Sequence, residues 1–284
     1  MKFYRIFESL IKKIYRLKNN TKNKFLKKAF LSAEYNMNTN KEYIFANEET
    51  TYLLKNNEEI SKRIFIDGKF DFDLLKNGLK YLGKKKGEYL INIGAHVGTT
   101  LIPAIKQKLF TNYIAFEPSL ENFRLLTANI NINKIEKNGV LFNLALSKKI
   151  SKGYLKKFDS NNSGDYRLVK KDNKSEQVKL DILDNFCNKI TRKNSLICID
   201  AQGHEFEIFR GGKKTLKKQI PIIFEFTPLM LVEKNPEILF NLIKHYEYII
   251  DLRENIILKT NLDNFIEIFN KYKKHKSYTD LMII

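Results

Sequence analysis

The stretch YLINIGAHVGTT, residues 89–100, decides the fold of this chain. Its first six residues form a short apolar run, typical of a strand that is buried on both faces. A helical pattern follows, from about Thr99 to Leu109. Between the two, Gly94 and Gly98 allow a ligand to approach the backbone, with the N-terminus of the helix behind it. The stretch therefore predicts a strand–turn–helix unit with a ligand site at the turn.

The chain on either side of this unit shows where the domain begins and how it continues. Helical patterns alternate with further apolar runs at NYIAFEP (112–118), GVLFNLAL (139–146), SLICID (195–200), IPIIFEF (220–226), YEYIIDL (246–252) and YTDLMII (278–284). Such alternation is typical of a mostly parallel sheet with helices on both faces. Residues 150–180 interrupt it with two short exposed strands around a predicted loop at 159–168. We assign residues 86–284 to one α/β domain and residues 1–85 to an N-terminal helix and polar lead-in.

Composition excludes several classes of protein. The 284 residues are 43% hydrophobic, which suits one globular domain with a sizeable core. The longest nearly apolar stretch, residues 220–232, is shorter than the roughly 20 residues that a membrane-spanning helix needs. Cys187 and Cys198 form no CxxC pair, so we expect buried free thiols and a cytoplasmic protein. No cluster of His, Cys and Asp has metal-binding spacing, and we expect no structural metal. The sequence leaves open whether the acceptor site uses a divalent ion.

The net charge of +19 is a poor indication of a nucleic-acid partner. Only eight of the 51 basic residues are arginine, the residue preferred for bidentate contacts to phosphates and bases. Lysine, asparagine and isoleucine are all abundant, and all three have AT-rich codons, so genome composition explains the balance. We therefore expect no nucleic-acid partner.

Residues 1–18 predict a basic amphipathic helix. Apolar residues recur at helical spacing from Phe3 to Leu17, and lysines and arginines fill most other positions. Such a helix can lie in an anionic membrane interface, which would place the protein at the inner face of the membrane. It can equally pack on the domain with a solvated lysine face. Charges throughout the segment are unlike a secretory signal.

The turn at residues 94–98 departs from the dinucleotide fingerprint GxGxxG. His96 stands where that motif has its second glycine, which lets a pyrophosphate approach. The turn therefore counts against NAD and FAD. Glu117 follows the next strand, 23 positions after Gly94, where an acid can accept hydrogen bonds from both ribose hydroxyls. Together these elements predict a nucleoside crevice; a tightly packed turn and a surface glutamate are the simpler alternative.

Taken together, these motifs resemble the FkbM-type S-adenosylmethionine-dependent methyltransferases. The similar segments lie between residues 89 and 284, in the order INIGAHVGTT, AFEPSLENFRLLTANI, NLALS, SGDYRL, ICIDAQGHEFEIFRGG, PIIFEFTP and YTDLMII. The resemblance implies the class I methyltransferase (Rossmann-like) fold, with a seven-stranded, mostly parallel sheet whose last strand is antiparallel. It also implies methyl transfer from S-adenosylmethionine to a hydroxyl, typically of a sugar or polyketide.

The resemblance also assigns residues to the cofactor. Those expected to contact it are Asn92, Gly94, Ala95, His96, Gly98, Glu117, Asn143, Ala145 and Asp200. Glu117 would hold the ribose, Asn143 and Ala145 would lie near the adenine, and Asp200 would face the transferred methyl. The family usually has an acid at the position of Asn92, where a carboxylate helps to hold the cationic end of the cofactor. An amide accepts hydrogen bonds there without charge assistance.

The acceptor needs a base and a binding surface. Asp200 and His204 are the candidate catalytic residues, because both follow the same strand end and either can take a hydroxyl proton. His204 can instead be a solvent-facing residue at a helix start. Glu225 either binds the acceptor or pairs with a lysine. The remaining candidates for substrate contact, or for an ordinary surface turn, are Asp165, Tyr166 and Arg167.

We therefore expect an O-methyltransferase whose partner is a hydroxyl-bearing sugar or glycan. Asn92 supports one alternative, a catalytically impaired methyltransferase-like subunit that binds within a glycan-assembly complex. The net charge suggests another, an RNA methyltransferase. Scarce arginine and the absence of an aromatic RNP-like motif argue against RNA.

Overall fold

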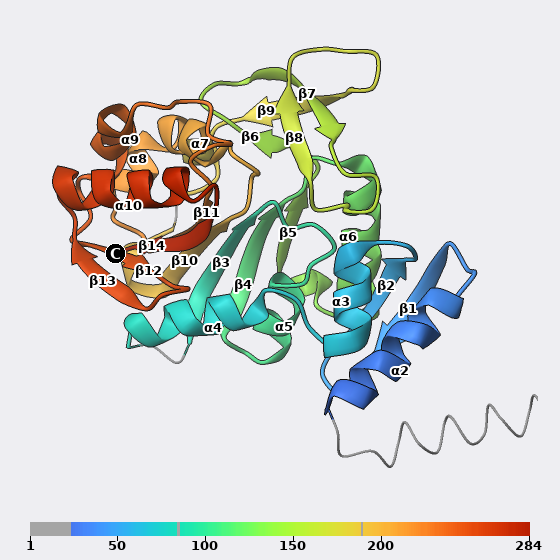
Figure 1. Cartoon of the computed structure of the whole chain (residues 1–284). Helices are drawn as coiled ribbons and strands as arrows, with labels where there is room; N and C mark the ends of the chain where they lie inside the picture. Colours follow the sequence, from blue (N-terminus) through green and yellow to red (C-terminus); the bar gives the residue numbers. More distant parts are fainter. Residues whose placement is uncertain (1–23, 84–85, 189) are drawn as a thin grey trace, which may run out of the picture.

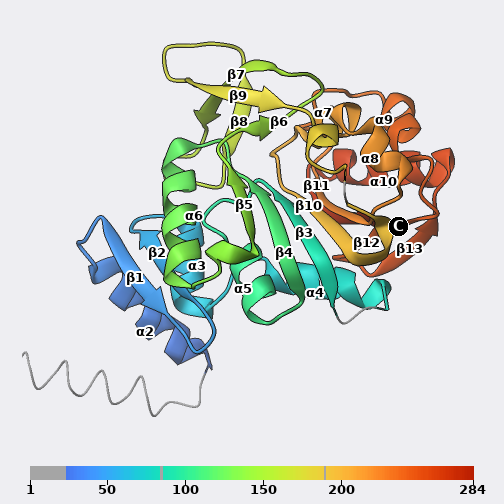
Figure 2. The same cartoon turned by 180° about the vertical axis from the view of Figure 1, so that it is seen from behind.

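The computed structural model describes residues 24–83, 86–188 and 190–284 (Figure 1). The amphipathic helix predicted at residues 1–18 lies outside these ranges. The lead-in contains helices and a two-stranded antiparallel sheet: α2 (Lys24–Met37), β1 (Glu42–Ala46), β2 (Thr51–Lys55), α3 (Glu59–Asp67) and α4 (Phe72–Tyr81). Helix α2 and strands β1 and β2 form the end of the molecule that lies away from the C-terminus (Figures 1 and 2).

The main sheet has eight strands in the described chain. In spatial order they are β13 (Ile256–Lys259), β12 (Tyr248–Asp251), β14 (Thr279–Ile283), β11 (Ile222–Phe226), β10 (Ser195–Ile199), β3 (Gly87–Ile93), β4 (Phe110–Phe116) and β5 (Gly139–Phe142). The prediction of seven strands was therefore one short. After β12 the chain turns back through Asn255, whose φ is +58°, and adds β13 as an antiparallel edge strand.

The strand order confirms the expected class I methyltransferase fold. Strands β5, β4, β3, β10 and β11 pair in parallel, and β14 runs antiparallel between β11 and β12. Because β14 runs the opposite way, its beginning lies at the edge where the parallel strands end. Glu225 of β11 consequently pairs in register with Asp280 of β14. Two acids far apart in the sequence thus meet at the carboxyl edge of the sheet.

Helices cover both faces of this sheet, as predicted. Neighbouring strand residues such as Leu90 and Ile91 enter opposite hydrophobic cores, because successive side chains of a strand alternate between faces. One core contains residues of α3, α4, α5 (Leu101–Lys106) and α6 (Leu120–Ile132). The other contains residues of α7 (Glu205–Gly211), α8 (Lys213–Lys217), α9 (Pro236–Ile243) and α10 (Leu262–Lys274). Cys187 and Cys198 are buried free thiols, which confirms their interpretation.

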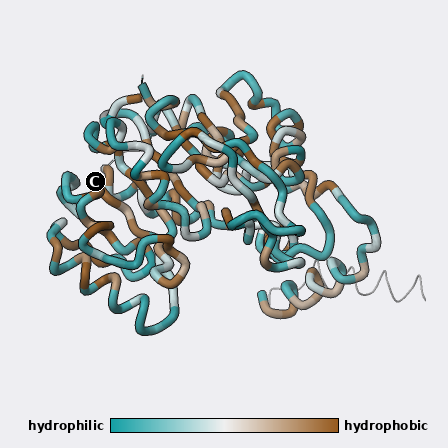
Figure 3. The backbone as a smooth tube through the Cα atoms, turned by 90° about the horizontal axis from the view of Figure 1, so that it is seen from above, coloured by the Kyte–Doolittle hydropathy of each residue, from teal (hydrophilic) through white to brown (hydrophobic). Residues whose placement is uncertain are grey.

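Hydrophobic and hydrophilic segments alternate along the chain, as expected of elements with one buried face (Figure 3). Among the helices that the structure describes, none combines the length and the apolar character needed to cross a bilayer.

A second, four-stranded sheet includes the two short strands predicted in the region 150–180. Its strands are β6 (Ala145–Leu146), β9 (Glu176–Asp181), β7 (Ser151–Lys157) and β8 (Tyr166–Val169). The single strand predicted at 139–146 was wrong, because β5 ends at Phe142 and β6 pairs with β9 instead. Between them, the Asn143 amide donates to the carbonyls of Glu117 and Pro118. The predicted loop is also shorter than expected, since Tyr166 to Val169 pair with β7.

Asn129 of α6 fixes the lead-in against the ligand turn. Its buried side chain accepts from the Leu53 backbone N–H at 2.6 Å and donates to the Val97 carbonyl at 3.0 Å. Buried residues of the lead-in, such as Leu54 and Leu75, belong to the same core as the sheet residue Leu90. This packing brings α3 and the start of α4 to the carboxyl edge of the main sheet.

Candidate functional site

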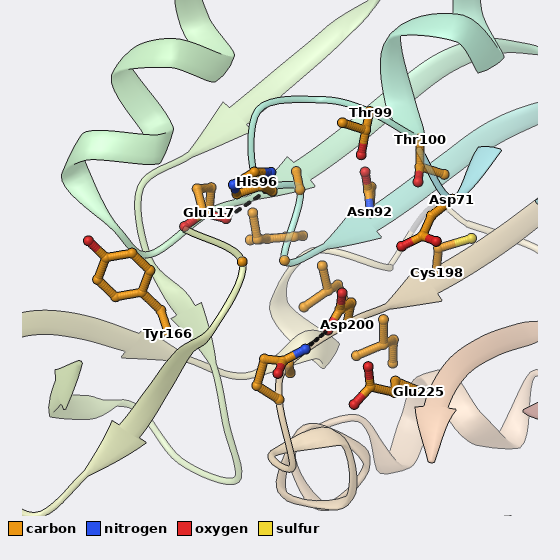
Figure 4. Close-up of a pocket in the computed structure, with 18 of the residues that line it drawn as sticks. Asp71, Asn92, His96, Thr99, Thr100, Glu117, Tyr166, Cys198, Asp200 and Glu225 are labelled. Carbon is orange, nitrogen blue, oxygen red and sulfur yellow. Dashed lines mark hydrogen bonds between the residues drawn. The ribbon is translucent and has the colours of Figure 1, made fainter. Parts of the chain in front are cut away.

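A cavity of about 390 Å³ opens at the carboxyl edge of the central strands (Figure 4). The turn after β3 and the ends of β4, β10 and β11 form its floor. Helices α3 and α4, the start of β14 and the small sheet form its walls. The carboxyl edge of a parallel sheet is the usual ligand position in open α/β folds.

Gly94 allows three strand ends to converge at this cavity. Its φ is +78°, and an added Cβ would lie 1.8 Å from the Asp200 carbonyl oxygen, so no side chain fits there. The N–H groups of Gly94 and Ala95 both donate to the Phe116 carbonyl at 2.9 Å. Gly98, with φ +93°, is similarly confined, because an added Cβ would lie 2.6 Å from Ile102 Cδ1. The glycine turn thus brings the ends of β3, β4 and β10 together.

His96 fastens the turn to its surroundings. It has φ +50°, an uncommon conformation for a side-chain-bearing residue, and its N–H donates to Glu117 Oε2 at 2.8 Å. Its Nε2 lies 2.7 Å from Ser163 Oγ, in the segment between β7 and β8. Burial, with a smaller effect from the Lys157 charge, lowers the pKa of His96 to about 4. His96 is therefore neutral at pH 7 and forms part of the cavity wall.

Glu117 is held in a fixed orientation at the end of β4. Its side chain is only 4% exposed and accepts from the N–H groups of His96 and Ser119, the latter at 2.9 Å. Burial raises its pKa to about 7, although both N–H donors act to lower it. The fixed carboxylate can accept hydrogen bonds from paired hydroxyls in the cavity, as the sequence predicts.

The other predicted cofactor residues divide into two groups. Asn92, Ala95 and Ala145 are buried and line the cavity. Asn92 Oδ1 has no hydrogen-bond partner among the described residues. Asn143 is exposed and does not line the cavity, because its amide is used in the Glu117–Pro118 loop. The structure therefore gives Asn143 a role in holding this loop and no place in the cavity lining.

Asp200 and Glu225 face each other across the acidic end of the cavity (Figure 4). Asp200 Oδ1 accepts from Gln202 Nε2 at 2.7 Å, and Glu225 Oε1 accepts from Thr227 Oγ1 at 2.9 Å. The Asp200 side chain is open to the cavity but withdrawn from bulk water, and this, with the Glu225 charge, raises its pKa well above the ordinary range. Burial, with the nearby Glu205 charge, raises the pKa of Glu225 to about 7.

His204 lies on the cavity wall beside the small sheet. Its Nε2 is 2.9 Å from Ser147 Oγ, and burial lowers its pKa to about 4. The alternative prediction, that His204 faces solvent at the start of a helix, was therefore wrong. The next residue, Glu205, supports the loop that follows β10, because its Oε1 accepts from the N–H groups of Ala201 and Gly203.

The three candidates at 165–167 do not act as one group. Tyr166 lines the cavity, whereas Asp165 and Arg167 do not. Asp165 Oδ1 pairs with Arg167 Nε at 2.6 Å, and the guanidinium lies over the Phe158 ring at 4.5 Å. Asp165 and Arg167 therefore stabilise the small sheet outside the cavity.

The sequence interpretation missed several polar cavity residues, among them Asp71, Arg253, Tyr278 and Asp280. Arg253 pairs with Asp280 and lies 4.4 Å from the centre of the Tyr278 ring. The sequence contained one indication of Asp280, an acid near the start of the apolar run 278–284. The start of that strand reaches the cavity because the strand runs antiparallel to β11. In the described parts of the chain, no group of three His, Cys, Asp or Glu side chains is arranged to hold a metal.

The comparison with protein families agrees with this geometry. The family model described as the methyltransferase FkbM domain matches residues 92–253, more than half of the chain. The chain belongs to the FkbM methyltransferase family. The match includes the glycine turn, Glu117, Asp200 and Glu225, whereas Asp71, Tyr278 and Asp280 lie outside it.

Solved structures provide distant comparisons for this FkbM family member. The methyltransferase FkbM from Methylobacillus flagellatus KT is 10% identical, with a TM-score of 0.44 over 91% of this chain and 59% of that one. The Pyrococcus abyssi tRNA (uracil-54, C5)-methyltransferase, in complex with S-adenosyl-L-homocysteine, is 12% identical, with a TM-score of 0.40 over 86% of this chain and 44% of that one. The chain thus spans less than two thirds of either protein. The search of curated proteins returned no match.

Proposed function

We propose that the protein transfers a methyl group from S-adenosylmethionine to a hydroxyl of a sugar or glycan. The observation that carries the proposal is one cavity with two chemically different ends, with Asp200 at the acidic one. One end holds the fixed Glu117 carboxylate, and the other holds Glu225. A nucleoside-bearing methyl donor and a polar acceptor can therefore meet beside Asp200.

The cavity residues fit the methyl donor. Glu117 presents a preoriented carboxylate for two ribose hydroxyls, and Gly94 leaves the space that an approaching ligand needs. Asn92 Oδ1 is a buried acceptor without a partner among the described residues, next to the turn that would hold the cationic end. When bound, the cofactor supplies an electrophilic methyl group on a sulfonium, whose sulfur leaves as a neutral thioether.

The chain contributes alignment and proton transfer. Closely held reactants gain much of the rate of such a displacement from orientation alone. Asp200 is our candidate for the base, because its raised pKa makes the carboxylate a better proton acceptor than an ordinary aspartate. His204 suits this role less well, since its pKa is about 4 and its Nε2 is shared with Ser147.

Calorimetric titration with S-adenosylmethionine and S-adenosylhomocysteine tests the cofactor half of the proposal. We expect micromolar binding by the wild-type protein and a loss of at least tenfold in Glu117→Ala. Labelled methyl transfer to mono- and oligosaccharides, with NMR of the product, tests whether the methyl is on oxygen. A folded protein that binds neither ligand contradicts the proposal.

Asn92 favours a second candidate, a methyltransferase-like binding subunit with impaired catalysis. An amide holds a cation less strongly than a carboxylate, because it lacks the negative charge. Asn92→Asp separates the candidates. If the wild type binds the cofactor and the variant binds it at least threefold more tightly, the asparagine only weakens the site. Binding that appears only in Asn92→Asp supports the impaired subunit.

A further inference from the structure

The cavity has a charge balance opposite to that of the chain. The chain carries a net charge of +19. Among the described residues that line the cavity there are two arginines, no lysine and six acids: Glu59, Asp71, Glu117, Asp200, Glu225 and Asp280. A cleft lined by one sign of charge concentrates ligands of the other sign. Because the pKa of Glu117 and of Glu225 is raised to about 7, these acids carry their full charge only above pH 7 or beside a cation. The cavity therefore favours a cationic ligand over phosphate and carboxylate groups.

Both cavity arginines already have acidic partners. Arg63 Nε lies 2.9 Å from Glu59 Oε1, and Arg253 pairs with Asp280 of β14. Within the described chain, no lysine or arginine forms an ion pair with the three other acids at this end, which are Asp71, Asp200 and Glu225. Of these three, Glu225 is partly buried, and a carboxylate withdrawn from water is unfavourable unless a cation or hydrogen-bond donor accompanies it.

The Asp71 carboxylate is exposed, and among the described residues the charges of Arg253 and Arg63 act on it without forming an ion pair. Asp71 precedes α4 with φ +55°, and its side chain makes no cap hydrogen bond to that helix. Figure 4 shows it beside Asn92, at the end of the cavity that also holds Asp200 and Glu225 and away from Glu117 and Tyr166. Asn92 Oδ1, on a side chain only 5% exposed, adds an unpartnered acceptor to the same end. The unpaired groups at this end include the Asp71 carboxylate and Asn92 Oδ1, so a ligand that supplies hydrogen-bond donors complements them.

Resting on the proposed function, we propose that the acceptor carries a protonated amine, which Asp71 and Glu225 bind while a neighbouring hydroxyl is methylated. An ammonium group supplies one positive charge and three hydrogen-bond donors. Asp200 remains available at the reacting centre, between the glycine turn and Glu225. The acceptor class is thus an amino sugar or amino polyol without phosphate near its reacting end.

This arrangement also directs the methyl group to oxygen. An amine held as ammonium between carboxylates has no lone pair, so it cannot act as a nucleophile. The hydroxyl oxygen forms the new bond to the methyl carbon, and the bond from that carbon to sulfur breaks with its electron pair on sulfur. The hydroxyl proton passes to Asp200. Glu225 and Asp71 keep the acceptor amine protonated and position the acceptor so that its hydroxyl lies beside Asp200.

Three cyclitols of similar ring size test the proposal: 2-deoxystreptamine, which carries amines, myo-inositol and myo-inositol 1-phosphate. Their binding to protein saturated with S-adenosylhomocysteine is measured by calorimetry at pH 7.5. We expect 2-deoxystreptamine to bind at least tenfold more tightly than myo-inositol and the phosphate to bind more weakly than either. Asp71→Asn and Glu225→Gln should each weaken 2-deoxystreptamine binding at least tenfold. Asp67→Asn makes the same change at an acid that pairs with Lys28, and should alter binding less than twofold.

The experiment can reject the cofactor assignment and the amine assignment independently of each other. If S-adenosylhomocysteine does not bind, the proposed function is overturned. If it binds normally but 2-deoxystreptamine binds no better than myo-inositol, or fails to bind, the amine assignment is overturned and the proposed function stands. Unchanged S-adenosylhomocysteine affinity in Asp71→Asn and Glu225→Gln shows that both variants are folded. Equal 2-deoxystreptamine affinity in those variants and the wild type also overturns the assignment.

Discussion

The backbone N–H of His96 donates a 2.8 Å hydrogen bond to the Glu117 carboxylate. The bond joins the turn after β3 to the end of β4, so the residue that replaces a glycine of the dinucleotide fingerprint also orients the predicted ribose acid. With the Ser119 N–H on its other oxygen, Glu117 cannot rotate without losing a bond. The carboxylate is therefore in place before any ligand arrives.

The pKa of Glu117 predicts how cofactor binding depends on pH. Burial raises that pKa to about 7, so the carboxyl is increasingly protonated below pH 7 and must lose its proton to accept two ribose hydroxyls. We expect the S-adenosylhomocysteine affinity of the wild type to fall up to about tenfold per pH unit below pH 7. Calorimetry at pH 5.5, 6.5, 7.5 and 8.5 measures it. In Glu117→Gln, affinity should be lower and this part of the pH dependence lost; an identical slope in both proteins contradicts the assignment.

Gly94→Ala tests the convergence of strand ends. The new methyl would meet the Asp200 carbonyl at 1.8 Å in a backbone with φ +78°. We expect the free energy of unfolding to fall by at least about 3 kcal/mol, measured by urea denaturation. Gly83→Ala is the matched control, because Gly83 has φ +60° but nothing within 4 Å of an added Cβ. The control should lose only about 1–2 kcal/mol; similar losses in both variants would show that steric contact is unimportant.

The His96–Ser163 contact predicts local protection of the segment between β7 and β8. Nε2 and Oγ are 2.7 Å apart, and Ser163 also accepts from Asn122 through its carbonyl at 2.8 Å. Loss of one buried hydrogen bond of about 1 kcal/mol should raise amide exchange roughly fivefold in residues 162–165. We expect this in Ser163→Ala, measured by hydrogen–deuterium exchange. Ser160→Ala, at an exposed serine of the same segment, should leave exchange there unchanged; equal protection in Ser163→Ala and the wild type refutes the prediction.

Arg253 predicts a pH-dependent contribution to stability. Burial raises the pKa of Asp280 to about 6, although the Arg253 charge acts to lower it. The folded state therefore holds the Asp280 proton more tightly than the unfolded chain does. Stability from this group therefore falls as pH rises from about 4 to 6, and Arg253 limits the loss. Arg253 is partly exposed, so we expect Arg253→Gln to reduce the free energy of unfolding by only about 1–2 kcal/mol at pH 8.

At pH 5 the same substitution should cost less, because Asp280 is then largely protonated. Urea denaturation at both pH values measures the difference. Arg124→Gln removes a surface pair with Glu42 and serves as the control, with an expected loss below about 0.5 kcal/mol at either pH. A larger loss at pH 5 than at pH 8 for Arg253→Gln reverses the predicted sign.

The sequence indicated those parts of the site that depend on neighbouring parallel strands. Gly94 and Glu117 follow consecutive strands, and consecutive parallel strands usually lie side by side, so their meeting could be predicted from spacing alone. Asp200 follows a buried strand and Glu225 lies near the end of another, so both reach the same edge. Apolar runs are sufficient for such predictions because burial on both faces requires an almost continuous apolar strand.

The sequence was less informative where polar segments form structure. Strand β8 was expected as a loop, because its pairing with β7 depends on backbone hydrogen bonds and its side chains are only half buried. Asn143 divided one apolar run into two strands that join different sheets. Neither outcome has a local signal, since each depends on which partner strand is available.

Local sequence thus determined the parallel strands, the glycine turn and the acids at their ends, because each depends on a short pattern of burial and backbone conformation. Tertiary structure alone decided that Asp71 of the lead-in and Asp280 of the last strand enter the same cavity. Asp280 does so because β14 runs antiparallel, and Asp71 because Asn129 and a shared core fix the lead-in against the ligand turn. These contacts join residues far apart in the chain, so no local pattern can encode them.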